Sequence, residues 1–223
     1  ALKDGLKGER LRTTIDHRLQ KRVQQIVGKH HQSLRFNEIH NAAALILDTE
    51  TGEVLAYIGN TRDPQNRHEN RVDVITSPRS SGSILKPLLF AAMLSEGELL
   101  PHTLVADVPT QISGYSPKNF DETYDGAVPA STALYRSLNI PAVRMLQDYG
   151  LQKFYGKLKK LSISTLHKPA SYYGLSLILG GSEVTLWDIT GVYASMARTL
   201  NHFPDYQGQY DPADYHQPEN LLS

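Results

Sequence analysis

The 223-residue sequence contains no cysteine, which excludes disulfide bonds, thiol catalysis and zinc–thiolate sites. Charge of one sign is not in excess either: Lys plus Arg and Asp plus Glu number 23 each, so there is no basic field for nucleic acid. The apolar segment from Leu85 to Leu94 is interrupted by Lys86 and is far shorter than the ~18 residues of a membrane span. The first residues show no signal-peptide pattern, so we expect a cytosolic protein or a piece of a longer one.

The composition is that of an ordinary globular protein, with 40% apolar and 21% charged residues. The length suits one large domain, or one domain with a short attachment. Near the start, the pattern predicts a short strand over 13–16 and a helix from Asp16 to His31. Two apolar runs, 42–47 and 53–58, flank a Gly-containing loop and predict a β-hairpin.

Helical patterns dominate after residue 80. A hairpin alone is not stable in water, so we expect an α+β fold in which an antiparallel sheet is backed by the helix that follows Ser83. Four further helices are predicted, over residues 129–135, 142–149, 151–161 and 183–200.

Ser83-Ile84-Leu85-Lys86 stands where a Gly- and Ser-rich loop enters an apolar helix. Three-residue spacing places a hydroxyl and an amine on one helical face, about 5–6 Å apart at Cβ. Free backbone N–H groups at the helix start would favour an oxyanion, which suits a nucleophilic serine. Alternatively, Ser83 is a helix cap and Lys86 an exposed lysine, since about one S-x-x-K is expected by chance in such a chain.

Ser137-x-Asn139 lies between two predicted helices. A turn there can point a hydroxyl and an amide into a cleft, where the hydroxyl exchanges a proton with a lysine and the amide binds a peptide carbonyl. Alternatively, this tripeptide is a simple helix break, with one of the two side chains capping the next helix before Pro141.

S-x-x-K followed some fifty residues later by S-x-N is the order found in penicillin-binding transpeptidases, and S-x-x-K is also the signature of class A β-lactamases. The chain resembles the class A, bifunctional penicillin-binding proteins, most of all those of the 1C type. Six ordered blocks carry this resemblance: TTIDHRLQ (13–20), AALILDTETGEVLAYIGN (43–60), RSSGSILKPLLFAAML (79–94), SPKNFDETYDGAV (116–128), ALYRSLNIPAVRML (133–146) and LGGSEVTLWDITGVYASMA (179–197).

The resemblance implies a penicillin-binding/serine β-lactamase-like transpeptidase fold and a serine acyltransferase that uses no cofactor. Ser83 would be acylated by D-Ala-D-Ala stem peptides of peptidoglycan, Lys86 would accept its proton, and Ser137 and Asn139 would form the second cleft motif. An amine from a neighbouring stem peptide would then resolve the ester and form a crosslink. β-Lactam antibiotics would acylate Ser83 and leave a slowly hydrolysed ester.

One motif of the family does not occur in these residues. Lys-[Ser/Thr]-Gly is absent, and the nearest string, Lys3-Asp4-Gly5, has the wrong middle residue. In relatives this motif lies on a later edge strand that completes the oxyanion hole, and the loss of one oxyanion donor costs about 10²–10³ in rate. We therefore expect a fold that is incomplete at its C-terminus and inactive until the remainder is supplied, on the same or a second chain.

The domain expectation is a lead-in with the first strand and helix over 1–40, and the N-terminal part of a transpeptidase domain over 41–223. The glycosyltransferase domain and membrane anchor of bifunctional relatives would precede this chain. The resemblance implies that the full-length protein is anchored in a bacterial inner membrane and acts at its periplasmic face.

Other functions stay open. A D,D-carboxypeptidase or β-lactamase would use the same serine with water as the acceptor, and a non-catalytic β-lactam sensor or scaffold would bind without turnover. A metal site is not expected, because the nine histidines show no ligand spacing and neighbours such as His30 and His31 point apart on a helix.

Overall fold

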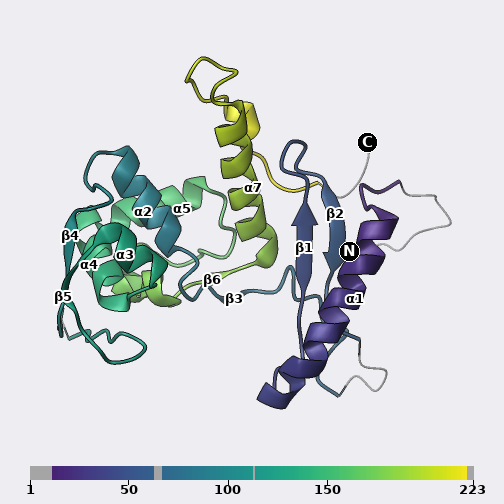
Figure 1. The fold of residues 1–223 in the computed structure, drawn as a ribbon, viewed down its shortest axis with the longest axis horizontal. Coiled ribbons are helices and arrows are strands. Elements are labelled where there is room, and N and C mark those ends of the chain that lie inside the picture. Colours follow the sequence, from purple (N-terminus) through teal and green to yellow (C-terminus); the bar gives the residue numbers. More distant parts are fainter. Residues whose placement is uncertain (1–11, 63–66, 113, 220–223) are drawn as a thin grey trace. The chain divides into compact units, whose positions relative to one another are not determined.

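The computed structural model describes residues 12–62, 67–112 and 114–219. The chain divides into two compact units (Figure 1). The first unit combines the residues up to Ser77 with those from Thr185 onward, and the second is the continuous segment Pro78–Val184.

The first unit is built on the predicted hairpin. Strand β1 (Ala44–Leu47) pairs antiparallel with β2 (Val54–Ile58), in the register Ala44↔Ile58. Helix α1 (His17–Leu34), followed by a 3-10 turn η1 (Arg35–Asn37), packs on β2 through a small core of Val23, Ala56 and Ile58. The hairpin and the helix from Asp16 are therefore confirmed.

The start of α1 shows why the strand expected over 13–16 is wrong. The Asp16 carboxylate caps the helix by accepting the N–H of Leu19 at 2.7 Å, so the helix begins directly at His17. Thr13 forms a single-residue β-bridge and not a strand. Thr14 Oγ1 donates to the carbonyl of Val54 at 2.7 Å, and the Asp16 N–H donates to the carbonyl of Leu55 at 3.0 Å. Too few residues remain before the cap to form a paired strand.

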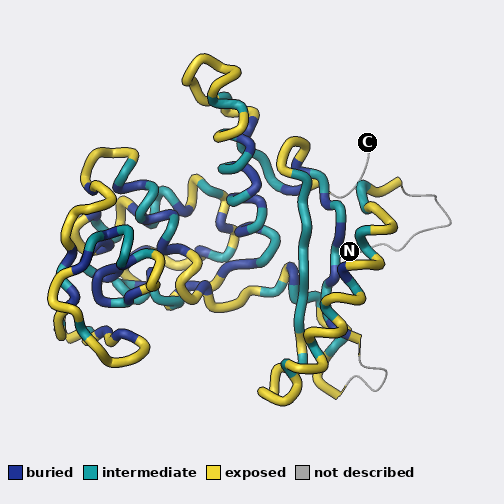
Figure 2. Tube along the Cα trace, in the orientation of Figure 1, coloured by how far each residue is buried: buried dark blue, intermediate teal, exposed yellow. Residues whose placement is uncertain are grey.

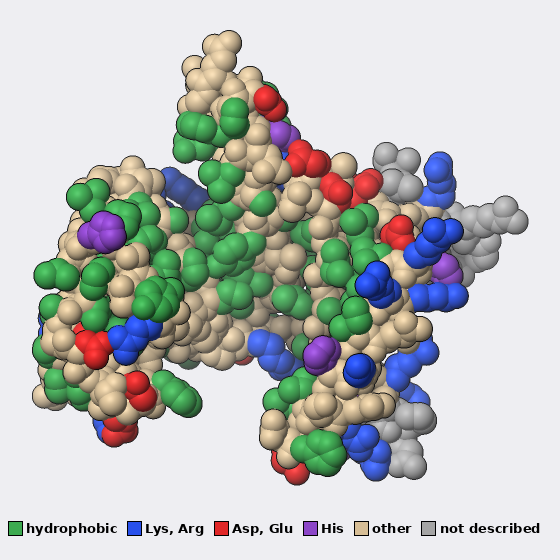
Figure 3. Space-filling view, viewed as in Figure 1, with side chains coloured by type: hydrophobic (Ala, Val, Ile, Leu, Met, Phe, Trp, Pro, Cys, Tyr) green, Lys and Arg blue, Asp and Glu red, His purple; other side chains and the backbone are tan. Residues whose placement is uncertain are grey.

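The surface of α1 is basic. Between His17 and Leu34 it carries Arg18, Lys21, Arg22 and Lys29 and no acidic residue, and the blue side chains over α1 in Figure 3 show this face. The zero net charge of the chain is thus an average over an uneven distribution.

Helix α7 (Leu186–His202) and the 3-10 turn η3 (Pro212–Asp214) complete the first unit, and α7 packs on β1. Arg198 of α7 is 2% exposed; its guanidinium donates to the carbonyl of Glu50 at 2.8 Å and to that of Asp214 at 2.6 Å. Within this unit the sheet is covered by α1 and α7, whereas the helix that follows Ser83, which we expected to back the sheet, belongs to the second unit.

The second unit is mainly helical. Its strands form two short pairs, β4 (Leu104–Asp107) with β5 (Gly126–Pro129) and β3 (Arg79–Ser80) with β6 (Glu183–Val184). The helix expected to start at 183 therefore begins later, because residues 183–184 pair with β3 and Thr185 caps α7. The helices of this unit are α2 (Lys86–Ser95), α3 (Ala130–Tyr135), α4 (Asn139–Tyr149), α5 (Leu151–Lys160), α6 (Ala170–Tyr173) and the 3-10 helix η2 (Gly174–Leu179).

The core of the second unit lies where α2, α4, α5 and η2 meet, and the buried stretches of these elements are dark in Figure 2. Its members are large apolar side chains that are at most 1% exposed: Leu85, Leu89, Ile140, Leu146, Phe154, Leu158, Leu177 and Ile178. Helix α4 supplies two of them and contacts both α2 and β4, so it is the central element of this unit. Among the described residues, no helix is both long and apolar enough to cross a membrane.

The cap of α7 gives a stability prediction. Thr185 Oγ1 accepts the N–H of Asp188 at 3.0 Å, and Thr185→Ala should lower the free energy of unfolding by about 1 kcal/mol. Thr190→Ala is the matched control in the same helix: Thr190 Oγ1 only donates back to the Leu186 carbonyl, so its loss should change stability by less than about 0.5 kcal/mol. Denaturant unfolding measures both, and equal effects would contradict the capping role.

Candidate active site

Ser83 lies in a tight turn that leads into α2. Gly82 has a φ of +51°, a left-handed conformation that costs glycine little. The N–H of Ile84 then donates to the Ser81 carbonyl and that of Lys86 to the Ser83 carbonyl, both at 3.1 Å. The helix was expected to include Ser83, but α2 begins at Lys86, and Ser83 is exposed in the hydrogen-bonded turn before it.

The Lys86 side chain turns inward and is 3% exposed. Its Nζ donates to the Ser137 carbonyl at 2.7 Å, to Asn139 Oδ1 at 2.8 Å and to Ser137 Oγ at 3.2 Å. Three of the four residues predicted from sequence thus meet at one amine. No hydrogen bond joins the Ser83 hydroxyl to Lys86 in this structure, so Ser83 is placed beside the cluster only through its turn.

Burial lowers the pKa of Lys86 to about 8, because removal from water penalises the charged amine. No carboxylate among the described residues forms an ion pair with Lys86 that would oppose this effect. A substantial fraction of the amine is therefore neutral near physiological pH, as a proton acceptor requires.

The three acceptors around Lys86 differ in what they can do. The Ser137 carbonyl and Asn139 Oδ1 accept only, and they match the two N–H groups of a neutral amine. The Ser137 hydroxyl can accept from the ammonium or donate to the neutral amine. The cluster therefore satisfies both protonation states, with Ser137 as the group that changes role.

Ser137 and Asn139 are placed by the turn between α3 and α4. Ser137 has a φ of +55°, which costs a non-glycine residue roughly 1–2 kcal/mol. This conformation lets both its carbonyl and its hydroxyl bond Lys86. Asn139 is the first residue of α4, and its Nδ2 donates to the Lys118 carbonyl at 2.9 Å, which fixes which end of the amide faces Lys86. One N–H of this amide remains for another acceptor.

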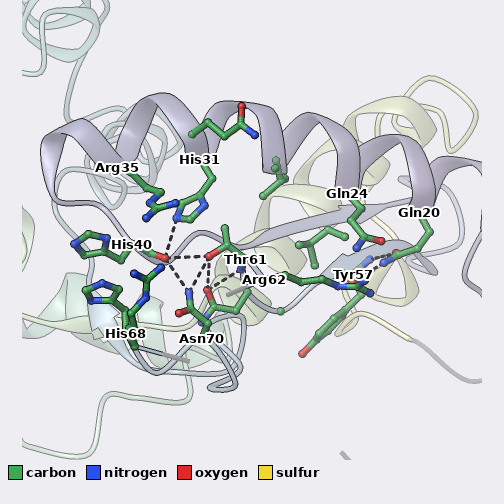
Figure 4. Close-up of a pocket in the computed structure, with 17 residues that line it drawn as sticks. Gln20, Gln24, His31, Arg35, His40, Tyr57, Thr61, Arg62, His68 and Asn70 are labelled. Atoms are coloured by element: carbon green, nitrogen blue, oxygen red, sulfur yellow. Dashed lines mark hydrogen bonds between the residues drawn. The ribbon is translucent and has the colours of Figure 1, made fainter. Parts of the chain in front are cut away.

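The first unit contains a cavity of about 570 Å³ between α1 and the residues that follow β2 (Figure 4). His40 lines this cavity, and its carbonyl accepts from His31 Nε2 at 2.9 Å and from Thr61 Oγ1 and Asn70 Nδ2 at 3.0 Å each. The rings of His40 and His68 stack with centroids 3.6 Å apart. None of the four predicted site residues lines this cavity, and in the described part of the chain no three His, Asp or Glu side chains are grouped to hold a metal ion.

A comparison with known protein families shows to which family this chain belongs. A family model described as "Penicillin binding protein transpeptidase domain" matches residues 42–197, which is more than half of the chain and includes all four predicted site residues. The chain belongs to the penicillin-binding protein transpeptidase family. The resemblance drawn from the sequence blocks is therefore confirmed.

Curated relatives from distant bacteria agree. Penicillin-binding protein 1C of Escherichia coli is 33% identical over 192 residues, which cover 86% of this chain. Penicillin-binding protein 1F of Bacillus subtilis is 30% identical over 193 residues, which cover 85% of it. The chain spans about a quarter of the length of these relatives, 25% and 26% respectively.

Solved penicillin-binding proteins share the fold. PonA1 of Mycobacterium tuberculosis, in complex with penicillin V, matches 96% of this chain with a TM-score of 0.74 at 21% identity, over 54% of its own chain. Penicillin-binding protein 3 of the same organism, complexed with ampicillin, matches 85% with a TM-score of 0.70 at 25% identity, over 47% of its own chain. The α+β transpeptidase fold expected from the sequence is thus confirmed.

The strand pair β3–β6, which the sequence did not predict, supports the turn of Ser83 in this transpeptidase fold. The Ser81 N–H donates to the Ser182 carbonyl at 2.9 Å, and Ser80 Oγ donates to the Gly180 carbonyl at 2.9 Å. Gly180 has a φ of +95°, and a Cβ there would lie 2.9 Å from Gly82 N. The sequence feature that could have indicated this contact is the pair Gly180-Gly181, because glycine often marks a place where another backbone approaches closely.

Gly180→Ala should therefore destabilise the protein by about 1–3 kcal/mol, since its Cβ would meet the Gly82 backbone as well as Ser80 Oγ. Gly156→Ala is the control: Gly156 lies inside α5 with nothing within 4 Å of a new Cβ, so alanine should raise stability by about 0.5–1 kcal/mol. Denaturant unfolding of both variants tests this, and a neutral Gly180→Ala would mean that the close approach does not constrain the turn.

Proposed function

We propose that this chain is part of a peptidoglycan D,D-transpeptidase domain that forms an acyl-enzyme on Ser83. The observation that carries the proposal is the buried Lys86 amine, bonded to both residues of the S-x-N motif and one turn after an exposed serine. From the membership in the penicillin-binding family we infer that the substrates are stem peptides that end in D-Ala-D-Ala. β-Lactams are the corresponding inhibitors, as in the solved complexes of PonA1 with penicillin V and of penicillin-binding protein 3 with ampicillin.

In the acylation step, Ser83 Oγ attacks the carbonyl carbon between the two D-alanines, and its proton passes to the neutral amine of Lys86. A serine hydroxyl is a weak nucleophile without such a base. The missing Ser83–Lys86 hydrogen bond does not oppose this role, because catalytic hydrogen bonds often tighten only when substrate is bound. Collapse of the tetrahedral intermediate breaks the C–N bond and releases the terminal D-alanine.

Ser137 and Asn139 serve the same step in different ways. The Ser137 hydroxyl relays the proton from Lys86 to the departing amine, since it can donate and accept in turn. The remaining N–H of Asn139 binds a carbonyl of the stem peptide. An amine of a neighbouring stem peptide then attacks the ester, whereas water as the acceptor would make the protein a carboxypeptidase.

The wider context of the domain is part of the proposal. Residues 41–223 form the N-terminal part of the transpeptidase domain, and 1–40 form its lead-in. In the full-length protein, an N-terminal membrane anchor and a glycosyltransferase domain precede the transpeptidase domain. The protein acts at the periplasmic face of the inner membrane. Activity requires a Lys-[Ser/Thr]-Gly strand from the rest of the domain, because the 223 residues do not contain this motif.

Labelling with a fluorescent penicillin tests the nucleophile. We expect a covalent adduct on Ser83 in a form of the protein that continues past Ser223 to include Lys-[Ser/Thr]-Gly, and at least about a hundredfold slower labelling of the 223-residue chain. Intact mass and peptide mapping locate the adduct, and Ser83→Ala is the negative control. Absence of an adduct on the folded, extended protein would favour a non-catalytic scaffold. Trapped acylation without crosslinked product would favour a β-lactam sensor.

The lowered pKa of Lys86 predicts the pH dependence of acylation. Because the neutral amine accepts the proton, the second-order rate constant should rise with pH up to about 8 and level off above it. Stopped-flow acylation of the extended protein across this range measures the profile. Lys86→Arg should lower the rate by at least about a hundredfold at every pH, since a guanidinium stays charged. A flat wild-type profile would remove Lys86 as the base.

A further inference from the structure

Asn139 is held from two sides by consecutive residues of the loop between β4 and β5. The Lys118 carbonyl accepts from Asn139 Nδ2 at 2.9 Å, while Asn119 Oδ1 accepts the backbone N–H of Asn139 at 2.9 Å and that of Ile140 at 3.3 Å. The Leu138 side chain at the N-cap offers no acceptor, so Asn119 caps α4 from a distant part of the chain. Ile140 is fully buried, and water could not easily replace this cap.

The orientation of the Asn119 amide is set by Asp107. Asn119 Nδ2 donates to Asp107 Oδ1 at 2.7 Å and to the Thr123 carbonyl at 2.9 Å. The reversed amide would place its oxygen against these two acceptors and its NH₂ against the two backbone N–H groups, so only one orientation is satisfied. Asp107 and Asn119 are 1% and 3% exposed, which makes an unmatched contact costly.

Asp107 is itself fixed by the β4–β5 pair. It is the last residue of β4 and lies opposite Gly126, and its Oδ2 accepts the N–H of Asp125 at 3.1 Å. Strand β5 runs directly into α3, which ends at the turn containing Ser137. The Asp107 carboxylate therefore connects the β4–β5 pair, through Asn119, to the start of α4. Strand β5 itself leads, through α3, to Ser137, the other residue of the S-x-N motif.

We propose that Asp107 and Asn119 are positioning residues for acyl transfer: through Asn139 they hold the Lys86 amine in place without touching the substrate. This inference rests on the proposed function and extends it to two residues outside the S-x-x-K and S-x-N motifs. The contacts run in series from Asp107 to Asn119, from Asn119 to Asn139, and from Asn139 Oδ1 to Lys86. A loosened Asn139 would admit water to Lys86 and release one of its two obligate acceptors.

The test uses the full-length protein with Asn119→Ala. We expect acylation by fluorescent penicillin to slow by about tenfold to a hundredfold, since a small misplacement of a catalytic group has effects of this size. The loss should fall on the acylation rate at saturating penicillin more than on its half-saturating concentration. Glu122→Gln, in the same loop, is the matched control: its exposed carboxylate bonds only the Lys118 ammonium, so acylation should be unchanged.

A swap of the two side chains separates positioning from simple loss of packing. Asn119→Asp alone places two carboxylates together and should slow acylation at least as much as Asn119→Ala. In the double variant Asp107→Asn with Asn119→Asp, the new carboxylate still accepts both N–H groups of α4. The new amide donates to that carboxylate and accepts from Asp125. Acylation should therefore recover several-fold over Asn119→Asp, and not fully, because the Thr123 carbonyl loses its donor.

The pKa of Lys86 gives a readout independent of acylation. Admitted water reduces the desolvation of the amine, so Asn119→Ala should move the Lys86 NMR titration from about 8 toward the ordinary lysine value. If folded Asn119→Ala keeps both the wild-type acylation rate and the wild-type Lys86 titration, the positioning role is overturned. It is also overturned if the losses follow only the unfolded fraction and the swap gives no recovery. If the wild-type protein is never acylated, the proposed function is overturned, and the Lys86 titration then decides only whether Asn119 holds the Lys86 amine in its buried position.

Discussion

The burial of one lysine amine is the constraint on which the second unit depends. Lys86 is 3% exposed, so its amine must find partners for its N–H groups within the protein, and α2 offers none at that position. The turn between α3 and α4 supplies them, which requires Ser137 in a left-handed conformation and Asn139 at the first position of α4. The same burial that demands these acceptors lowers the pKa of Lys86, so the structural requirement and the chemical one have a single cause.

Much of the site could be predicted because its residues are marked by short spacings. Ser83 with Lys86 and Ser137 with Asn139 are local patterns, and the family resemblance links them across the chain. The prediction placed Ser83 at the start of the helix, whereas Ser83 lies in a turn that follows the left-handed Gly82, and α2 begins only at Lys86. Periodicity alone does not reveal that a Gly-Ser pair forms a turn of its own before the helix begins.

The strands β3 and β6 and the roles of Asp107 and Asn119 could not be predicted in the same way. Each two-residue strand exists only because its partner, distant in sequence, offers two backbone groups, and no alternation of apolar residues marks it. Asn119 lies in a turn-rich stretch where a polar amide is expected at the surface, yet it is buried against α4. Such contacts depend on tertiary packing, which overrides local propensity.

The pairing of β3 with β6 also bears on how the chain folds. The first unit is assembled from two stretches separated by the whole of the second, and the Val54 N–H reaches the Glu219 carbonyl at 2.7 Å across that interval. Closing so long a loop directly is slow, because its entropy is lost before the contacts form. The second unit is continuous, and pairing Arg79 with Val184 brings its two ends together. The chain is thus organised as one continuous unit inserted into another, and we expect the strand pair beside the turn of Ser83 to shorten the loop that the first unit must close in order to fold.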